Sequence, residues 1–135
     1  MNILAVEPFY SGSHKAFQRG LREHSRHRVI PVNLSYKGRK WRMHGNSVVL
    51  AGMAREVKEN IDLLLVSSMT DLPSFLSLTN PRFSEVPKIM YMHENQFTQP
   101  MPEGEDRDHT YCYLNYLSML SADRLIFSSK FHRND

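Results

Sequence analysis

The stretch DLLLVSS at residues 62–68 decides the fold class of this chain. Four apolar residues follow one another between an aspartate and two serines, which is typical of a strand buried on both of its faces. Such strands occur where helices cover both sides of a parallel sheet. The stretch therefore favours an α/β fold.

Strands and helices are expected to alternate on both sides of this stretch. The expected strands are residues 2–6, 27–34, 62–68, 86–92 and 123–129, and the expected helices are residues 14–25, 46–60, 71–78 and 109–122. In the last helix, one face carries Tyr113, Tyr116, Leu117 and Leu120. This alternation predicts an open, parallel, Rossmann-like sheet in a single domain over residues 1–135, since 135 residues make about one ordinary domain.

Composition indicates a cytoplasmic protein with no membrane partner. No apolar run approaches the roughly 18 residues that span a bilayer, and the first residues lack the basic and long apolar regions of a secretion signal. Cys112 is the one cysteine, so the chain has neither an internal disulfide nor a thiolate metal cluster, in agreement with a reducing compartment. We expect Cys112 to be buried.

Charge is unevenly distributed along the chain. Residues 1–60 carry a net charge of +7 and residues 61–135 a net charge of −4. No acid lies between Glu23 and Glu56, where seven basic residues accumulate: Arg26, Arg28, Lys37, Arg39, Lys40, Arg42 and Arg55. Such a block favours a polyanionic partner, most commonly RNA, and the alternative is a solvated basic face.

Polar loops follow four of the expected strands, and in open α/β sheets ligands bind at this carboxyl edge. In the first loop, EPFYSGSH, Gly12 allows a close approach of the backbone, and Ser13 is expected to cap a helix whose N–H groups face a phosphate. Glu7 and His14 flank the turn. The loop matches neither the dinucleotide-binding nor the Walker pattern, and an ordinary strand-to-helix turn also uses glycine and serine.

The loop HENQFTQP at residues 93–100 begins with a histidine, a carboxylate and two amides in four consecutive positions at the end of a strand. These groups supply a proton acceptor, an anion and side chains that read hydroxyl groups. A structural or solvated histidine is the alternative. The run is not a zinc-binding HExxH helix, because position 97 is Phe97, so we expect no metal.

Five segments resemble, in this order, the amino-terminal domain of the tRNA-queuosine alpha-mannosyltransferases: EPFYSGSHK, KWRMH, LLLVSSMTDLPSFLSL, YMHENQFTQP and YLNYLSMLSADRLIFSSKFHRND. The acidic loop at residues 103–109 and the TYCY that follows depart from the family pattern. The resemblance implies the amino-terminal half of a two-domain, GT-B-type glycosyltransferase, with the carboxyl-terminal donor-binding domain absent from this chain. It implies retaining transfer of mannose from GDP-mannose to queuosine in tRNA, with no cofactor or metal, and a fragment that is inactive alone.

The resemblance also implies roles for individual residues. It implies catalytic roles for His93, Glu94 and Glu7. It implies substrate binding by Gly12, Ser13, His14, Ser68, Asn95 and Gln96. RNA binding falls to Lys37, Arg39, Lys40, Trp41 and Arg42, with Trp41 stacking on a base or, alternatively, plugging the core. The expected partners are tRNA, a nucleotide sugar and the carboxyl-terminal domain. The competing hypothesis is a non-catalytic RNA- or nucleotide-binding module.

Overall fold

A single sheet of five parallel strands forms the centre of the molecule. The computed structural model describes residues 1–35 and 39–135, and the side chains of residues 39–43 lie outside the description. The strands are β1 (Asn2–Glu7), β2 (Arg28–Asn33), β3 (Leu63–Ser67), β4 (Lys88–Met92) and β5 (Arg124–Phe127). Their order across the sheet is β2-β1-β3-β4-β5, and every neighbouring pair is parallel. The predicted α/β fold is confirmed.

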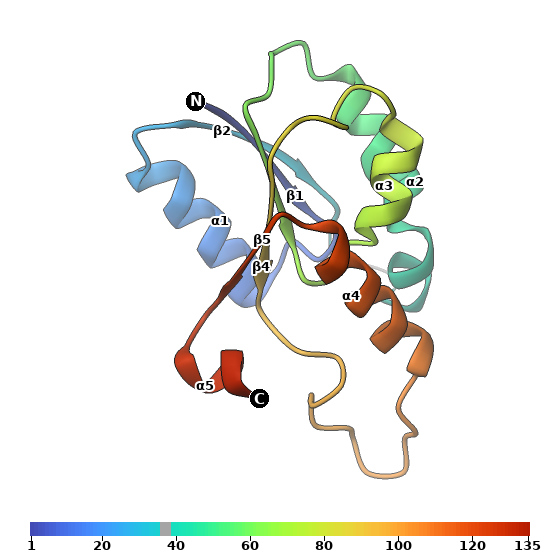
Figure 1. Ribbon diagram of the computed structural model, residues 1–135. Helices are drawn as coiled ribbons and strands as arrows, with labels where there is room; N and C mark the ends of the chain where they lie inside the picture. Colours follow the sequence, from blue (N-terminus) through green and yellow to red (C-terminus); the bar gives the residue numbers. More distant parts are fainter. Residues whose placement is uncertain (36–38) are drawn as a thin grey trace.

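Helices cover the two faces of the sheet unequally. They are α1 (Gly12–His24), α2 (Arg39–Glu56), α3 (Leu72–Thr79), α4 (His109–Ser121) and α5 (Lys130–Asn134). Helix α1 lies on one side of the sheet, and α2, α3 and α4 lie together on the other (Figure 1). The expected helix at residues 46–60 was wrong at both ends, because α2 begins at Arg39 and ends at Glu56.

The sheet separates two apolar clusters. Leu4 and Val6 of β1 are buried in the larger cluster with residues of β3, β4, α2 and α3. Ile3 and Ala5, which alternate with them, belong to the smaller cluster beneath α1. Neighbouring residues of β3 likewise pack into opposite clusters, which is why its sequence is apolar without interruption.

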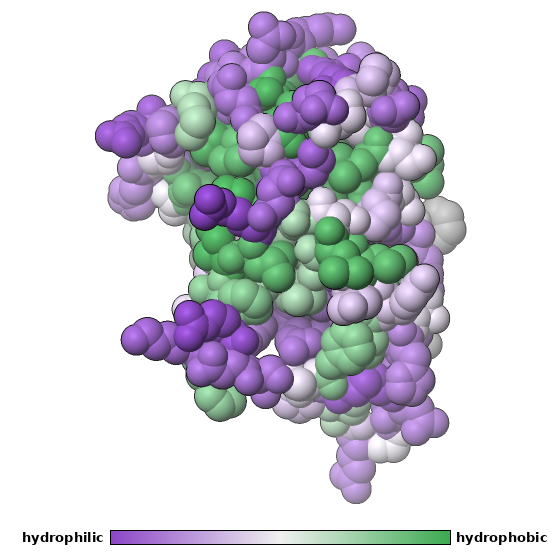
Figure 2. All heavy atoms as spheres, viewed as in Figure 1, coloured by the Kyte–Doolittle hydropathy of each residue, from purple (hydrophilic) through white to green (hydrophobic). Residues whose placement is uncertain are grey.

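Helix α4 buries a polar face. Cys112, Asn115 and Ser118 are buried, whereas Tyr113, Tyr116 and Leu120 are exposed. The amide Nδ2 of Asn115 donates to the carbonyl of Ser68 at 2.8 Å, and the Ser118 hydroxyl donates to the carbonyl of Thr70 at 2.9 Å. Met119 packs against the larger cluster, but Tyr113, Tyr116 and Leu120 face outward. Figure 2 shows hydrophobic side chains gathered over α4 and β5.

Helix α2 holds the same loop, residues 68–71, from a second direction. Its Asn46 donates from Nδ2 to the carbonyl of Met69 at 3.1 Å, and its Ser47 hydroxyl donates to the carbonyl of Asp71 at 2.6 Å. Both side chains are buried. Buried polar groups are costly without partners, so these bonds fix the loop backbone in one position.

Across the described residues, no helix combines the length and the apolar character needed to cross a membrane.

Candidate functional site

Glu7 ends β1 and is the most deeply buried acid of the site. Its side chain lies at the carboxyl edge of the sheet and the residue is 3 % exposed. One carboxylate oxygen accepts the backbone N–H of Phe9 at 2.7 Å, and the other bonds to Nδ1 of His14 at 2.9 Å. Both oxygens therefore have partners, and the carboxylate has a fixed orientation.

His14 joins the first loop to the loop after β4. It lies in the first turn of α1, and its Nε2 bonds to Oε2 of Glu94 at 3.2 Å. Burial alone would lower the pKa of His14, but the hydrogen bonds and charges of Glu7 and Glu94 raise it to about 10. At neutral pH the ring is an imidazolium that donates from both nitrogens, so it holds Glu94 in place.

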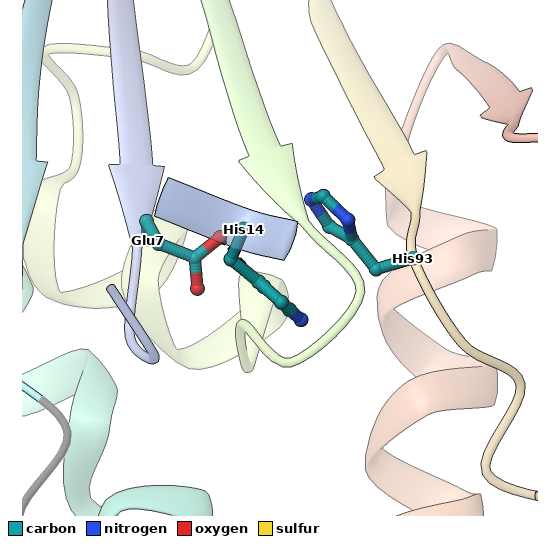
Figure 3. Close-up of side chains that lie close together, drawn as sticks. All are labelled: Glu7, His14 and His93. Carbon is teal, nitrogen blue, oxygen red and sulfur yellow. Dashed lines mark hydrogen bonds and ion pairs between the residues drawn. The ribbon is translucent and has the colours of Figure 1, made fainter. Parts of the chain in front are cut away.

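His93 stacks on His14 at the end of β4. The ring centroids are 3.9 Å apart with an interplanar angle of 19°, and Figure 3 shows the two side chains arriving from different elements. Phe17 and Tyr91 contact the His93 ring edge-on, and the His93 backbone N–H donates to the Ser68 hydroxyl at 3.3 Å. Burial and the adjacent His14 charge lower the pKa of His93 to about 4, so this ring is neutral at pH 7.

Among the described residues, Glu7, His14 and His93 place possible metal-ligand atoms within 4.8 Å of one another. However, a ligating imidazole needs a free lone pair, and both nitrogens of His14 bond to carboxylates. The hydrogen bonds therefore describe an ion-paired imidazolium rather than a metal-ligand set. The expectation of a metal-free site stays a prediction.

The amino terminus of α1 opens onto the same edge. Ser11, not the expected Ser13, is its N-cap, and the Ser11 side chain makes no capping bond. Gly12 has a φ of +49°, a conformation that favours glycine. An open hollow of about 280 Å³ lies here, lined by Phe9, Ser11, Gly12, Ser13, His14, Met69, Glu94 and Gln99. Thus the α1 terminus and Glu94 border one space.

Asn95 and Gln96, both expected to bind substrate, hold the loop together in this structure. Asn95 accepts the backbone N–H of Phe97 on its side-chain oxygen at 3.0 Å, which forms a turn. Gln96 is 6 % exposed, and its amide contacts the sulfur of Met69 at 3.1 Å. By contrast, the Glu94 side chain is 22 % exposed, and its Oε1 has no hydrogen bond within the described part of the chain.

The expected RNA contacts at residues 37–42 stay a prediction. Lys37 lies outside the described residues. Arg39, Lys40, Trp41 and Arg42 belong to the first turns of α2, and their side chains lie outside the description.

Two parts of the site had not been anticipated from the sequence. Phe9 and Met69 are buried together with half-buried Tyr111 packed against them, so the loops after β1 and β3 share an apolar contact. Arg107 donates to the carbonyls of Gln96 and Gln99, the latter at 2.9 Å, and closes the loop after β4. The available signal for Arg107 was its position as the lone cation in the acidic run EGEDRDH.

Comparisons with known proteins agree on one family. The family model for the amino-terminal region of tRNA-queuosine alpha-mannosyltransferases matches residues 2–135. A tRNA-queuosine alpha-mannosyltransferase of Drosophila melanogaster is 33% identical over 134 residues, which are 98% of this chain and 35% of that protein. The chain thus spans about a third of the length of this curated relative. No solved structure matches the chain.

Proposed function

Because this chain belongs to the tRNA-queuosine alpha-mannosyltransferase family, we propose that it forms the amino-terminal part of a retaining glycosyltransferase that moves mannose from GDP-mannose to queuosine in tRNA. The observation that carries this proposal is the linked set of Glu7, His14, Glu94 and His93 at the carboxyl edge of the sheet. That edge is where open α/β sheets bind their ligands.

The α1 amino terminus is proposed to meet the donor. Gly12 and Ser13 begin the helix, where the backbone N–H groups have no partner within the helix. The first turn contains no acid, and the His14 charge is balanced by Glu7 and Glu94, so the attraction for an anion comes from the N–H groups of the helix end. Such a terminus favours an anion, so it suits the diphosphate of a nucleotide sugar.

Glu94 and His93 are proposed to face the reacting sugar. In the transfer, the bond from the anomeric carbon to the diphosphate breaks with its electron pair leaving on the diphosphate, and the acceptor oxygen bonds to that carbon. The acceptor hydroxyl loses its proton, for which Oε1 of Glu94 is the open acceptor. The neutral His93 ring lies next to Glu94 in the sequence and serves as a hydrogen-bonding group. The oriented carboxylate of Glu7 stabilises the positive charge that develops on the sugar.

The remaining roles rest on the family alone. We infer that Ser68, Asn95 and Gln96 line the substrate site, that the residues at 37–42 named above contact tRNA, and that the enzyme works in the cytoplasm without a metal or cofactor. Because the chain covers 35% of the Drosophila relative, we infer that a carboxyl-terminal domain supplies most donor contacts. The 135-residue chain is then inactive alone, since the reactants are not held together.

The test is to incubate tRNA that contains queuosine with GDP-mannose and either this chain or the full-length protein, and to weigh the modified nucleoside by mass spectrometry. We expect a hexose to be added by the full-length protein and not by the chain alone. Addition by the chain alone would contradict the two-domain proposal. No addition by a folded full-length protein would remove the transferase function and favour the non-catalytic binding module.

A further inference from the structure

Helix α1 carries a row of exposed cations on its outer side. Lys15, Arg19 and Arg22 are spaced by four and three residues, so they lie on one face of the helix, and all three are exposed. From Lys15 to Arg22 the row extends about 10 Å along the helix axis at 1.5 Å per residue. We call these three residues the α1 basic row.

The α1 basic row is not neutralised by neighbouring acids. The ion pairs between described side chains are those of His14 with Glu7 and Glu94 and that of Arg28 with Glu59, and none involves the row. Glu23 is the one acid of α1, and it is not paired with Arg19 four residues earlier. Lys15 lies over the ring of Tyr10, with Nζ 5.8 Å from the centroid. Three positive charges are therefore open to a polyanion.

The position of the row connects it to the candidate site. Helix α1 begins at the carboxyl edge, where His14 contacts Glu94, and it runs back toward the amino end of β2. Lys15 directly follows His14 in the sequence, so the row starts beside the site and leads away from it along one helix. A strand of phosphates lying on the row would thus bring its neighbouring nucleotides to the site.

We propose that Lys15, Arg19 and Arg22 bind the phosphate backbone of RNA and guide the tRNA acceptor to the site at the amino end of α1. The choice of RNA rests on the proposed function, because the family acts on tRNA. The row is separate from the expected RNA contacts at residues 37–42. Phosphate contacts fix position without reading bases, so the row binds tRNA with and without queuosine.

The experiment measures binding of an unmodified tRNA transcript to this chain by fluorescence anisotropy across a range of salt concentrations. The variant is Arg19→Gln with Arg22→Gln. The matched control is Lys58→Gln with Arg124→Gln, which removes two exposed cations near the amino ends of β3 and β5. Far-ultraviolet circular dichroism establishes that both variants fold.

Each lost phosphate contact flattens the plot of log affinity against log salt by roughly 0.7 to 0.9. Between about 50 and 200 mM salt, wild type should therefore lose roughly 7- to 12-fold more affinity than the variant of the row. The control should keep the wild-type slope. Because the transcript is unmodified, the result does not depend on sugar transfer. RNA binding by the α1 basic row can therefore be confirmed even if the transfer experiment refutes the proposed function.

Three outcomes would overturn the proposal. The first is a wild-type chain that does not bind tRNA at low salt, and the second is equal slopes for the row variant and its control. The third is a variant that keeps its tRNA affinity but loses binding to vesicles of phosphatidylserine and phosphatidylcholine, which would make the row a membrane contact.

Discussion

The rings of His14 and His93 lie face to face, with centroids 3.9 Å apart, yet they hold opposite protonation states. His14 bonds to two carboxylates, which raise its pKa to about 10 despite its burial. His93 is also buried, but it faces the His14 charge, and its pKa falls to about 4. One ring stays charged and the other stays neutral over most of the physiological range.

The two histidines should give the chain a stability maximum near pH 6.5. Folding raises the pKa of His14, so its contribution is complete below about pH 6.5 and is lost as the pH rises through about 10. Folding lowers the pKa of His93, so its contribution is present above about pH 6.5 and is lost as the pH falls through about 4. Urea unfolding across this range measures the profile.

Two variants test the two sides of that profile. His93→Gln should flatten the acid decline. His14→Gln should flatten the alkaline decline and also weaken the acid decline, because it removes the charge that helps to lower the pKa of His93. The charges of Glu7, Glu94 and His132 also affect the pKa of His93. The stability of each variant is therefore compared with that of wild type at each pH. A wild-type stability that rises between about pH 7 and 9 would contradict the charged state of His14.

Glu7→Gln should destabilise the chain by about 1–3 kcal/mol, because the buried side chain would no longer accept from both of its partners. The amide keeps the shape of the carboxylate, so the loss reports on charge and hydrogen bonding rather than on a cavity. Glu23→Gln on the exposed face of α1 is the control and should change stability little. Equal urea midpoints for both variants would count against the role of Glu7.

On the proposed function, His93→Ala should lower turnover by the full-length protein by roughly 10²- to 10⁴-fold, as is typical when an acid, base or equivalent contact is lost. Asn95→Ala should act more mildly, because the Asn95 side chain bonds to the backbone of its own loop. His24→Ala, at the exposed end of α1, is the control. The measurement is kcat and KM by mass spectrometry of the product nucleoside, and similar losses for His93 and Asn95 would contradict the ranking.

Two glycines of α1 should respond in opposite directions to alanine. Gly12 has a φ of +49°, which strains any residue with a Cβ, so Gly12→Ala should cost about 1–2 kcal/mol. Gly20 lies inside the helix with no atom within 4 Å of an added Cβ, so Gly20→Ala should stabilise the chain by about 0.5–1 kcal/mol. Thermal unfolding at fixed pH measures both, and a stabilising Gly12→Ala would refute the strain argument.

The sequence was sufficient for the strands but not for every helix. The apolar residues of β3 pack into a cluster on each face of the sheet, and packing of this kind leaves an uninterrupted apolar pattern. Helix α4 is different, since its buried Asn115 and Ser118 bond to a loop backbone while Tyr113 and Tyr116 face outward. An apolar periodicity indicates that a helix has one apolar face, but it does not show whether that face packs on the core or is exposed.

The sequence predicts where the site lies but not which hydrogen bonds connect its side chains. The rule that loops meet at the carboxyl edge brings Glu7, His14 and His93 together from sequence alone. That His14 bridges Glu7 to Glu94 depends on side-chain directions at positions far apart in the chain. The burial of Gln96 against Met69 could not be predicted either, because Gln96 is a polar residue in a polar loop.

The outer edge of β5 has a consequence for how RNA binding is measured. Within the described residues, β5 pairs with β4 alone, and Ile126 on this strand is 44% exposed. Open strand edges with apolar side chains promote pairing between chains. Two paired chains would present two basic rows to one tRNA, and such avidity would raise the apparent affinity without any stronger contact. Titrations at several protein concentrations would therefore separate the intrinsic affinity of one row from the gain that self-association adds.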